Sequence, residues 1–548
     1  METASLKPAM PEEARLHKKE VLGLAGLFIV FRLMTLFWFQ PYYSEFTTFF
    51  YPFLELSDAR VLAEYSQPAD QLIGGTGKAA EPQELQPALP FIDYWLEYPP
   101  VFVWIAYAIY HANAIIFGPH AGGAFVFSTS VSVFLAFVDM LNVLLIYAIA
   151  KRINGHSFGL RAGVAYAMLF FPAVVMAGYF DTFVLFTILL SLWAMVAGYA
   201  GIAGSAAGLG IMTKFIPVLL VPAALRYLGR VPVLAVPGAV EMPLEKAVAS
   251  KATVANVPQP PPPAKLPMLW DWNRVIHYFG TMVLTIGVAS ATFLFVRPDL
   301  LIMPFKVTLK RGGWESLRAL ASGQNDFGHV GPTAAWLAQH PEFYSEINSP
   351  YVGAIRNMTV FNGVSKVSIP EPERARIASR FTTRLDYLQA PSDYLAIPML
   401  IVLGALYFIA WLFMPEGAKP LHFVALTGIT FATGFVYSAG WSPQFVVYML
   451  PLVLLGLSKR TNVFFAVALS VVTFVEMPVW LRYLRLGLPG GPDGTAAAVL
   501  WVVVILRTAL LITVAIMMYL EVQNKAAADE LALSGKSQTP KSAGPAPS

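Results

Sequence analysis

Carboxylates in the first polar segment of the chain are candidates for acid–base or metal chemistry. Asp58 follows the first apolar run, and Asp93 and Glu97 lie four residues apart in Asp93-Tyr-Trp-Leu-Glu97. If that segment is helical, Asp93 and Glu97 share one face of the helix. A carboxylate in such a position can act as a general base or bind a divalent cation through its oxygens. The alternative is a solvated acidic loop.

Basic residues elsewhere could bind an anion. Lys310 and Arg311 precede Gly-Gly-Trp-Glu315. A guanidinium beside a glycine pair suits phosphate, because its donors are planar and the glycine turn leaves room for the anion. A basic cluster that only contacts the membrane interface is the alternative. Lys214 stands in apolar sequence, where a lone cation needs an anionic partner.

Other polar residues lie at the ends of apolar runs or inside them. Asp181 precedes the run that starts at Thr182, so we expect a helix cap, a functional contact or both. Gln444 starts a helix after a tight turn. Asp139 and Asn142 lie within one apolar run, where structural hydrogen bonds to neighbouring helices are the expected role.

Composition excludes several kinds of chemistry. The 548 residues include no cysteine and only 8 histidines, so disulfides, thiolate metal sites and catalytic thiols are excluded and an imidazole metal site is not expected. There is no P-loop and no dinucleotide-binding glycine pattern. The formal charge of +4 gives no indication of nucleic-acid binding.

The elements that must position these residues are membrane helices. Hydrophobic residues make up 57% of the chain and charged residues 13%, whereas soluble domains carry about 25% charged residues. Apolar runs of about 18 residues recur between Val21 and Leu520. The sequence therefore predicts an all-α polytopic membrane protein with about 12 transmembrane helices, in a range of about 10 to 13, and large extracytoplasmic loops.

Basic residues set the predicted orientation. Lysines and an arginine precede the first span at Val21, and the pairs Lys151/Arg152 and Lys459/Arg460 follow later spans. The positive-inside rule places these residues, and the N-terminus, in the cytoplasm. The further spans are expected at about 126–150, 160–178, 182–199, 278–297, 394–413, 420–438, 444–458, 462–480 and 497–520.

Two segments are ambiguous. Residues 101–117 either span the membrane or lie in the outer interface, and 202–225 is either one helix or two halves broken at Thr213-Lys214. An interfacial 101–117 together with a broken hairpin at 202–225 puts both basic pairs on the cytoplasmic side. We prefer that combination.

These spans divide the chain into four parts. They are an N-terminal membrane module (1–225) with a first external loop (40–99), a Pro-rich cytoplasmic linker (226–277), a C-terminal membrane module (278–520) with an external segment (298–393), and a disordered cytoplasmic tail (521–548). The proline run in the linker indicates a spacer, with an SH3-type ligand as the alternative.

The motifs, taken in order, resemble the GT-C superfamily of integral membrane glycosyltransferases, specifically polyprenol-phosphate-mannose-dependent mannosyltransferases. The resemblance covers about residues 20–480. It rests on Ser57-Asp58, Asp93-Tyr-Trp-Leu-Glu97-Tyr-Pro-Pro100, Tyr179-Phe-Asp181, Thr213-Lys214-Phe-Ile-Pro217, Lys310-Arg311-Gly-Gly-Trp-Glu315-Ser316 and Ser442-Pro443-Gln444. The Pro-rich insert and the stretch 323–386 depart from the compact pattern of the family, which leaves the acceptor open.

The resemblance implies a multi-pass enzyme of the cytoplasmic membrane with an extracytoplasmic active site. It would transfer a hexose, with mannose as the candidate, from a polyprenyl-phosphate donor to a glycan, lipid or protein of the cell envelope. Asp58 matches the catalytic base. Arg311, Lys214 and Lys310 would bind the donor phosphate, and the expected sugar or acceptor contacts are Asp93, Glu97, Tyr98, Asp181, Glu315 and Gln444.

Cofactor use and function class leave alternatives. Some members of the superfamily need a divalent ion and others do not, so no cofactor is certain and Mg²⁺ or Mn²⁺ is the candidate metal. A transporter or flippase of lipid-linked sugars is the alternative function. It should show internal repeats and polar groups along a path through the bilayer, and the sequence shows no repeat. A structural or assembly protein is a third interpretation, under which the named charges could be replaced without loss of activity.

Overall fold

The computed structural model of the chain describes most of the predicted spans. The described residues are 12–38, 45–51, 54, 89–92, 96, 98–118, 123–229, 231–232, 268–269, 271–298, 301–302, 304–305, 313, 315–321, 395–415, 419–458, 460–477 and 494–536. The predicted site residues Asp58, Asp93, Glu97, Lys310 and Arg311 lie outside these ranges. Most of the predicted linker and external segment also lie outside them, as do residues 537–548 of the predicted tail. Residues 521–536 of that tail are helical rather than disordered.

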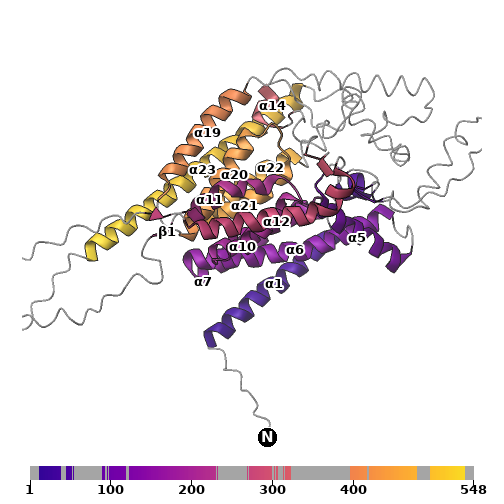
Figure 1. Cartoon of the computed structure of the whole chain (residues 1–548), viewed down its shortest axis with the longest axis horizontal. Helices are drawn as coiled ribbons and strands as arrows, with labels where there is room; N and C mark the ends of the chain where they lie inside the picture. Colours follow the sequence, from indigo (N-terminus) through magenta and orange to yellow (C-terminus); the bar gives the residue numbers. More distant parts are fainter. Residues whose placement is uncertain are drawn as a thin grey trace, which may run out of the picture.

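The described chain is a bundle of helices (Figure 1). The helices before the predicted linker are α1 (Glu12–Trp38), α5 (Pro100–Phe117), α6 (Gly123–Asn154), α7 (His156–Met168), α8 (Phe171–Gly178), α9 (Asp181–Val196), α10 (Ala200–Ile211) and α11 (Val221–Gly229). The helices that follow are α12 (Trp272–Val296), α14 (Leu317–Ala321), α19 (Ala396–Phe413), α20 (Pro420–Tyr437), α21 (Val446–Gly456), α22 (Thr461–Phe474) and α23 (Gly494–Lys536).

Short elements connect these helices. A π-helical turn, η1 (Phe46–Phe50), follows α1, and the 3-10 turns η2 (Ile216–Leu220) and η5 (Pro443–Phe445) precede α11 and α21. β1 (Val231–Pro232) pairs antiparallel with β2 (Met268–Leu269). This small ribbon lies at the two ends of the predicted linker, and every other regular element of the described residues is helical.

The helices confirm a multi-pass membrane protein of the all-α class. Within the described residues, 6 helices are long and apolar enough to cross a bilayer, or up to 7 when a bent pair counts as one span. Shorter apolar helices lie beside them. No side chain of α19 is buried, although the helix is almost wholly apolar, and a helix of this kind is stable when lipid covers it. The total of about 12 spans stays a prediction.

One predicted span is broken, and one of the two ambiguous segments forms a single helix. Residues 160–178 are not one helix, because α7 and α8 meet at a 60° bend. Pro172 stands in the first turn of α8. In a continuous helix its missing N–H would leave the Met168 carbonyl oxygen without its partner, and its ring would clash with that carbonyl. Residues 101–117 lie in α5, a single helix of 18 residues that is apolar enough to span the membrane.

The segment 202–225 is a broken hairpin in which both halves lie along α12. Gly204 lies against Tyr278, and Met212 at the end of α10 accepts a hydrogen bond from Ser290, so α10 runs parallel to α12. The Arg274 guanidinium near the start of α12 lies 6.0 Å from the centre of the Tyr227 ring near the end of α11. The chain therefore reverses direction at Thr213-Lys214, between the two halves.

The bundle has two chemically different ends. Lys151 and Arg152 close α6, and Arg152 lies 5.7 Å from the Trp193 ring in the last turn of α9. We call this the basic end. α9 begins at Asp181, so its first turn lies at the opposite end, and the break at Lys214 lies there too. The positive-inside rule predicts that the basic end faces the cytoplasm.

Candidate functional site

An ion pair between Lys214 and Asp181 forms the centre of the candidate site. The Lys214 Nζ donates to both carboxylate oxygens of Asp181, each at 2.9 Å. Asp181 is fully buried, and the Lys214 side chain is 12% exposed. The anionic partner that the sequence predicted for Lys214 is thus supplied by the chain itself.

Local structure places both residues of this pair at helix ends. Phe180, not Asp181, occupies the N-cap position of α9 and makes no side-chain cap bond, so the predicted cap role of Asp181 is wrong. Asp181 is the first residue of the helix, where the helix dipole still favours a negative charge. Lys214 lies in the irregular backbone between α10 and η2.

Close helix packing sets the position of Lys214. α10 approaches α12 at Gly204 and Gly208, where an added Cβ would lie 2.0 Å from the Tyr278 carbonyl oxygen and 2.6 Å from that of Met282. Small residues four positions apart let two membrane helices approach in this way. Lys214 follows shortly after the end of α10, and its backbone N–H donates to the Gly210 carbonyl oxygen. The contact between α10 and α12 therefore fixes the backbone position of Lys214.

Aromatic rings and a hydroxyl enclose the ion pair. The Lys214 Nζ lies 4.9 Å from the centre of the Phe180 ring, 5.1 Å from Phe445 and 5.6 Å from Tyr98. The buried Tyr448 hydroxyl donates a hydrogen bond to Asp181 Oδ1. Ring faces attract a cation most strongly where water is excluded, so this cage holds the ammonium group in one place.

Glu45 is a site residue that sequence reasoning missed. It begins the turn that leads into η1, is buried, and accepts a hydrogen bond of 2.9 Å from the Tyr98 hydroxyl. The ring of Tyr98 in turn lies 4.7 Å from the ring of Phe180, which faces Lys214, so Glu45 lies next to the aromatic cage. The available signal was a carboxylate directly behind the first span, next to tyrosines.

A second polar cluster lies at the same end of the bundle. The buried Arg507 donates to the Glu476 carboxylate and to the Glu315 carbonyl oxygen, and its guanidinium lies 4.4 Å from the centre of the Trp441 ring. Trp441 in turn packs against Phe445 at 5.8 Å. This cluster holds the start of the predicted external segment on the membrane helices. Sequence analysis missed Arg507 and Glu476, although single charges inside apolar runs were the available signal.

The predicted site residues divide into groups. The structure brings Lys214, Asp181 and Tyr98 together. Glu315 contacts Arg507 through its backbone, and its φ of +47° places a non-glycine residue in the left-handed region. Gln444 is buried in η5, beside the Phe445 that faces Lys214.

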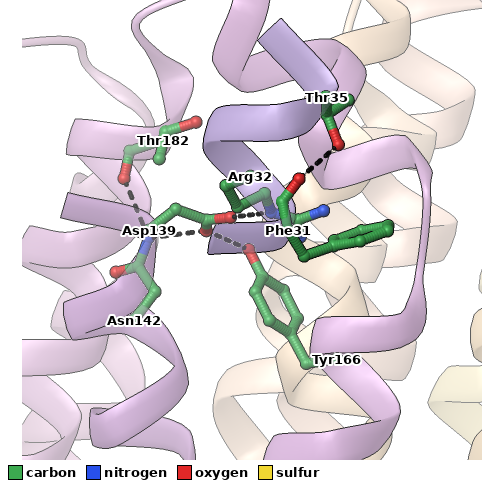
Figure 2. Close-up of polar contacts among 7 residues, drawn as sticks. All are labelled: Phe31, Arg32, Thr35, Asp139, Asn142, Tyr166 and Thr182. Atoms are coloured by element: carbon green, nitrogen blue, oxygen red, sulfur yellow. Dashed lines mark hydrogen bonds and ion pairs between the residues drawn. The ribbon is translucent and has the colours of Figure 1, made fainter. Parts of the chain in front are cut away.

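A buried network joins α1, α6, α7 and α9 (Figure 2). Asp139 accepts hydrogen bonds from Arg32 Nε at 3.0 Å, from the Tyr166 hydroxyl at 2.8 Å and from Asn142 Nδ2 at 3.3 Å. The same Asn142 nitrogen donates to the Thr182 carbonyl oxygen at 3.1 Å. The predicted structural hydrogen bonding of Asp139 and Asn142 is confirmed.

Metal binding stays a prediction. Among the residues that the structure describes, no group of three or more histidine, aspartate and glutamate side chains could hold an ion. The Asp93 and Glu97 pair, which motivated the expectation of Mg²⁺ or Mn²⁺, lies outside them.

No protein-family model matches the chain, and no curated protein matches its sequence. Among solved structures, ArnT from Cupriavidus metallidurans bound to undecaprenyl phosphate aligns with 13% identity over 95% of this chain and 81% of that chain, with a TM-score of 0.29. The Archaeoglobus fulgidus oligosaccharyltransferase in the apo form aligns with 11% identity over 91% of this chain, with a TM-score of 0.30. AglB from the same organism, in complex with an inhibitory peptide and a dolichol-phosphate, aligns with 14% identity and a TM-score of 0.26.

This chain covers 56% of each of those two oligosaccharyltransferase chains. At these TM-scores the alignments support no conclusion about function, so the function has to be argued from the residues of this chain.

Proposed function

We propose that this chain is a membrane glycosyltransferase of the GT-C type. It transfers a hexose, with mannose as the candidate, from a polyprenyl-phosphate donor to an extracytoplasmic acceptor. The observation that carries the proposal is the buried Lys214–Asp181 pair, which is enclosed by aromatic rings at one end of a membrane bundle. The loop residues that the sequence identified as acidic and phosphate-binding connect to helices at that same end.

Lys214 suits a role in orienting the donor phosphate. An ammonium group has three N–H donors, and two of them are used by the oxygens of Asp181. The third N–H can donate to a phosphate oxygen, because part of the Lys214 side chain is exposed. Because Asp181 offsets the charge of Lys214, we assign most of the electrostatic stabilisation of the phosphate to Arg311 and Lys310.

The proposed reaction is a single inverting displacement. The acceptor hydroxyl transfers its proton to Asp58 while its oxygen attacks the anomeric carbon of the sugar. The bond from that carbon to the phosphate oxygen breaks, and polyprenyl phosphate leaves with the electron pair. Negative charge develops on the leaving phosphate, and cations held in place beforehand stabilise it.

Tyr98 and Glu45 are proposed to contact the sugar or the acceptor. Their hydrogen bond places a hydroxyl and a carboxylate beside the Lys214 cage, and carboxylates and hydroxyls are natural partners for sugar hydroxyls. Asp93, Glu97, Glu315 and Gln444 keep the same proposed role. The reaction as written needs no metal, and a requirement for Mg²⁺ or Mn²⁺ would appear as loss of transfer in EDTA.

The predicted orientation places the reaction outside the cytoplasm. With the basic end in the cytoplasm, the Lys214 site faces the outer leaflet of the plasma membrane. A polyprenyl chain can lie between lipids while its phosphate reaches the interface. The proposed partners are therefore the donor lipid, the membrane and an envelope acceptor that is a glycan, a lipid or a protein.

A flippase of lipid-linked sugars is the second candidate, because the chain holds charges within its spans. Arg32, Asp139, Arg507 and Glu476 are all buried in helices, and intramembrane charges commonly mark transport paths. The two functions differ in their product: a flippase moves an intact donor, whereas a transferase releases polyprenyl phosphate.

The test is transfer of radiolabelled sugar by purified protein. Polyprenyl-phosphate-mannose and polyprenyl-phosphate-glucose would be offered with a membrane extract of the source cells, comparing wild type with Asp58→Asn and Lys214→Met. The matched control is Lys419→Met, which removes another lysine paired with an aspartate, Asp529, where both side chains are more than half exposed. Transfer lost in the first two variants and kept in the third supports the proposal. Folded wild type that transfers neither sugar but moves the donor across vesicles would establish the flippase instead.

A further inference from the structure

The network around Arg32 and Asp139 extends to Thr182, the residue next to Asp181 of the candidate site (Figure 2). Asn142 is the link. One hydrogen of its amide group faces Asp139 and the other faces the carbonyl oxygen of Thr182, which directly follows Asp181. Reversing the amide group would place its oxygen against two other oxygens, so the network fixes its orientation.

The ion pair is costly where it lies. Arg32 and Asp139 are both fully buried, and replacing such a pair with apolar side chains is often neutral or stabilising. Arg32 also leaves Nη1 and Nη2 without a hydrogen-bond partner among the described residues, with its guanidinium 4.6 Å from the centre of the Phe28 ring. Bundle stability alone therefore does not account for this arrangement.

Helix α6, which carries Asp139 and Asn142, also holds the chain on both sides of Asp181. Ser132 on α6 donates to the Ala177 carbonyl oxygen before the first turn of α9 at 3.2 Å, and Asn142 donates to Thr182 within it. Asp181 lies between these two anchors. A shift of α9 along its axis would separate the Asp181 oxygens from the Lys214 Nζ. Lys214 would not move with α9, because it follows α10, and α10 packs against α12.

We propose that Asn142, oriented by the Arg32–Asp139 pair, is a positioning residue that keeps Asp181 in register with Lys214. Its kinetic consequence rests on the transferase activity proposed above. The structural consequence, tighter order in the first turn of α9, does not depend on that activity.

The test variant is Asn142→Leu, which keeps the branching of the side chain at Cγ and removes both N–H donors. A displacement of about 1 Å in a catalytic group can lower turnover about 10²-fold, so kcat is expected to fall by about that factor. KM for the donor lipid should change little, because Asn142 is expected to make no contact with the donor. Amide hydrogen exchange in the peptide around residues 179–186 should become several-fold faster, since exchange reports local opening.

Asn462→Leu is the matched control. Like Asn142, Asn462 is buried and donates its side-chain amide to a backbone carbonyl, here that of Leu454. Asn462 lies in the first turn of α22, however, at the basic end of the bundle and away from the candidate site. The Asn462→Leu variant should therefore show unchanged kcat and unchanged amide hydrogen exchange around residues 179–186. Tyr166→Phe removes only the hydroxyl that donates to Asp139, so it serves as a milder variant with an intermediate effect if Asn142→Leu does not fold.

The outcomes separate the two proposals. Lower kcat with faster exchange in Asn142→Leu supports the positioning role. Unchanged exchange, or faster exchange with wild-type kcat, overturns it. A wild type that transfers no sugar while Asn142→Leu still shows faster exchange would refute the proposed function and leave the control of α9 by Asn142 standing.

Discussion

Removing one partner of the Lys214–Asp181 pair should destabilise the protein far more than removing both. Asp181→Asn leaves the Lys214 ammonium in a mostly buried aromatic cage without the Asp181 charge. Lys214→Met leaves a fully buried carboxylate whose remaining side-chain partner among the described residues is the Tyr448 hydroxyl. Breaking a buried pair in this way costs about 3–5 kcal/mol of unfolding free energy. The variant that carries both substitutions has no uncompensated charge, so most of that loss should be recovered.

Activity should not follow stability in this cycle. Lys214→Met and the double variant lack the ammonium group that orients the phosphate, and Asp181→Asn leaves that ammonium without the carboxylate that holds it in place. Sugar transfer should therefore be lost in each variant, including the double variant that regains stability. Unfolding would be measured by equilibrium titration with SDS in mixed micelles, and transfer with the radiolabelled donor. The corresponding cycle at Lys419 and Asp529 should show no measurable coupling, because that pair is exposed and solvent screens it.

Two results would refute this reasoning. If the two single losses of stability simply add in the double variant, the residues do not interact as a pair. If the double variant both regains stability and transfers sugar at the wild-type rate, the pair is a structural feature and the site lies elsewhere.

Further predictions concern the residues around the pair. Glu45→Gln should lower transfer by about 10- to 10²-fold, because a hydrogen bond from a sugar or acceptor hydroxyl to a charged carboxylate contributes about 1.5–3 kcal/mol. Tyr98→Phe should have a smaller effect, since it removes one neutral hydrogen bond; equal and small effects on transfer would make Glu45 structural. Gly204→Val should displace α10 and abolish transfer, because the added atoms overlap the Tyr278 carbonyl, while Gly201→Ala, whose Cβ meets only a 3.5 Å contact, should be tolerated; transfer assays on both decide this. Arg507→Met should release the start of the external segment, seen as faster hydrogen exchange around residues 315–321, and unchanged exchange there would contradict the anchoring role.

The sequence predicted the helical class because hydrophobicity is summed over many residues. The predicted span 126–150 lies within α6 (Gly123–Asn154), and the predicted span 278–297 overlaps most of α12 (Trp272–Val296), which begins earlier than expected. The break at Thr213-Lys214 was also predictable, because a lone lysine and Pro217 interrupt an apolar run. The bend between α7 and α8 was missed, since its proline lies inside a run whose composition is uniformly apolar.

The candidate site could be predicted only in part, for a physical reason. Lys214 was identifiable as a cation in need of a partner, but the partner depends on which helix ends meet, and sequence spacing does not contain that information. Asp181 was therefore interpreted as a helix cap, a functional contact or both, without being identified as the partner of Lys214, and Glu45 was not singled out among many loop residues. Arg507 and Glu476 form a pair only after α22 and α23 pack together.

Orientation in the membrane decides which compartment the site faces, and the absence of cysteine makes it directly measurable. Cysteines introduced singly at Pro260, Lys419 and Gln339 can be labelled with a membrane-impermeant maleimide in intact cells and again after lysis. Lys419 marks the basic end through its contact with Asp529 at the far end of α23, and Pro260 lies in the predicted linker. Both should label only after lysis, and Gln339 should label in intact cells. The reverse pattern would put Lys214 and Asp181 on the cytoplasmic side, where an extracytoplasmic acceptor cannot reach them, and the proposed reaction would be excluded even if the ion pair proves essential.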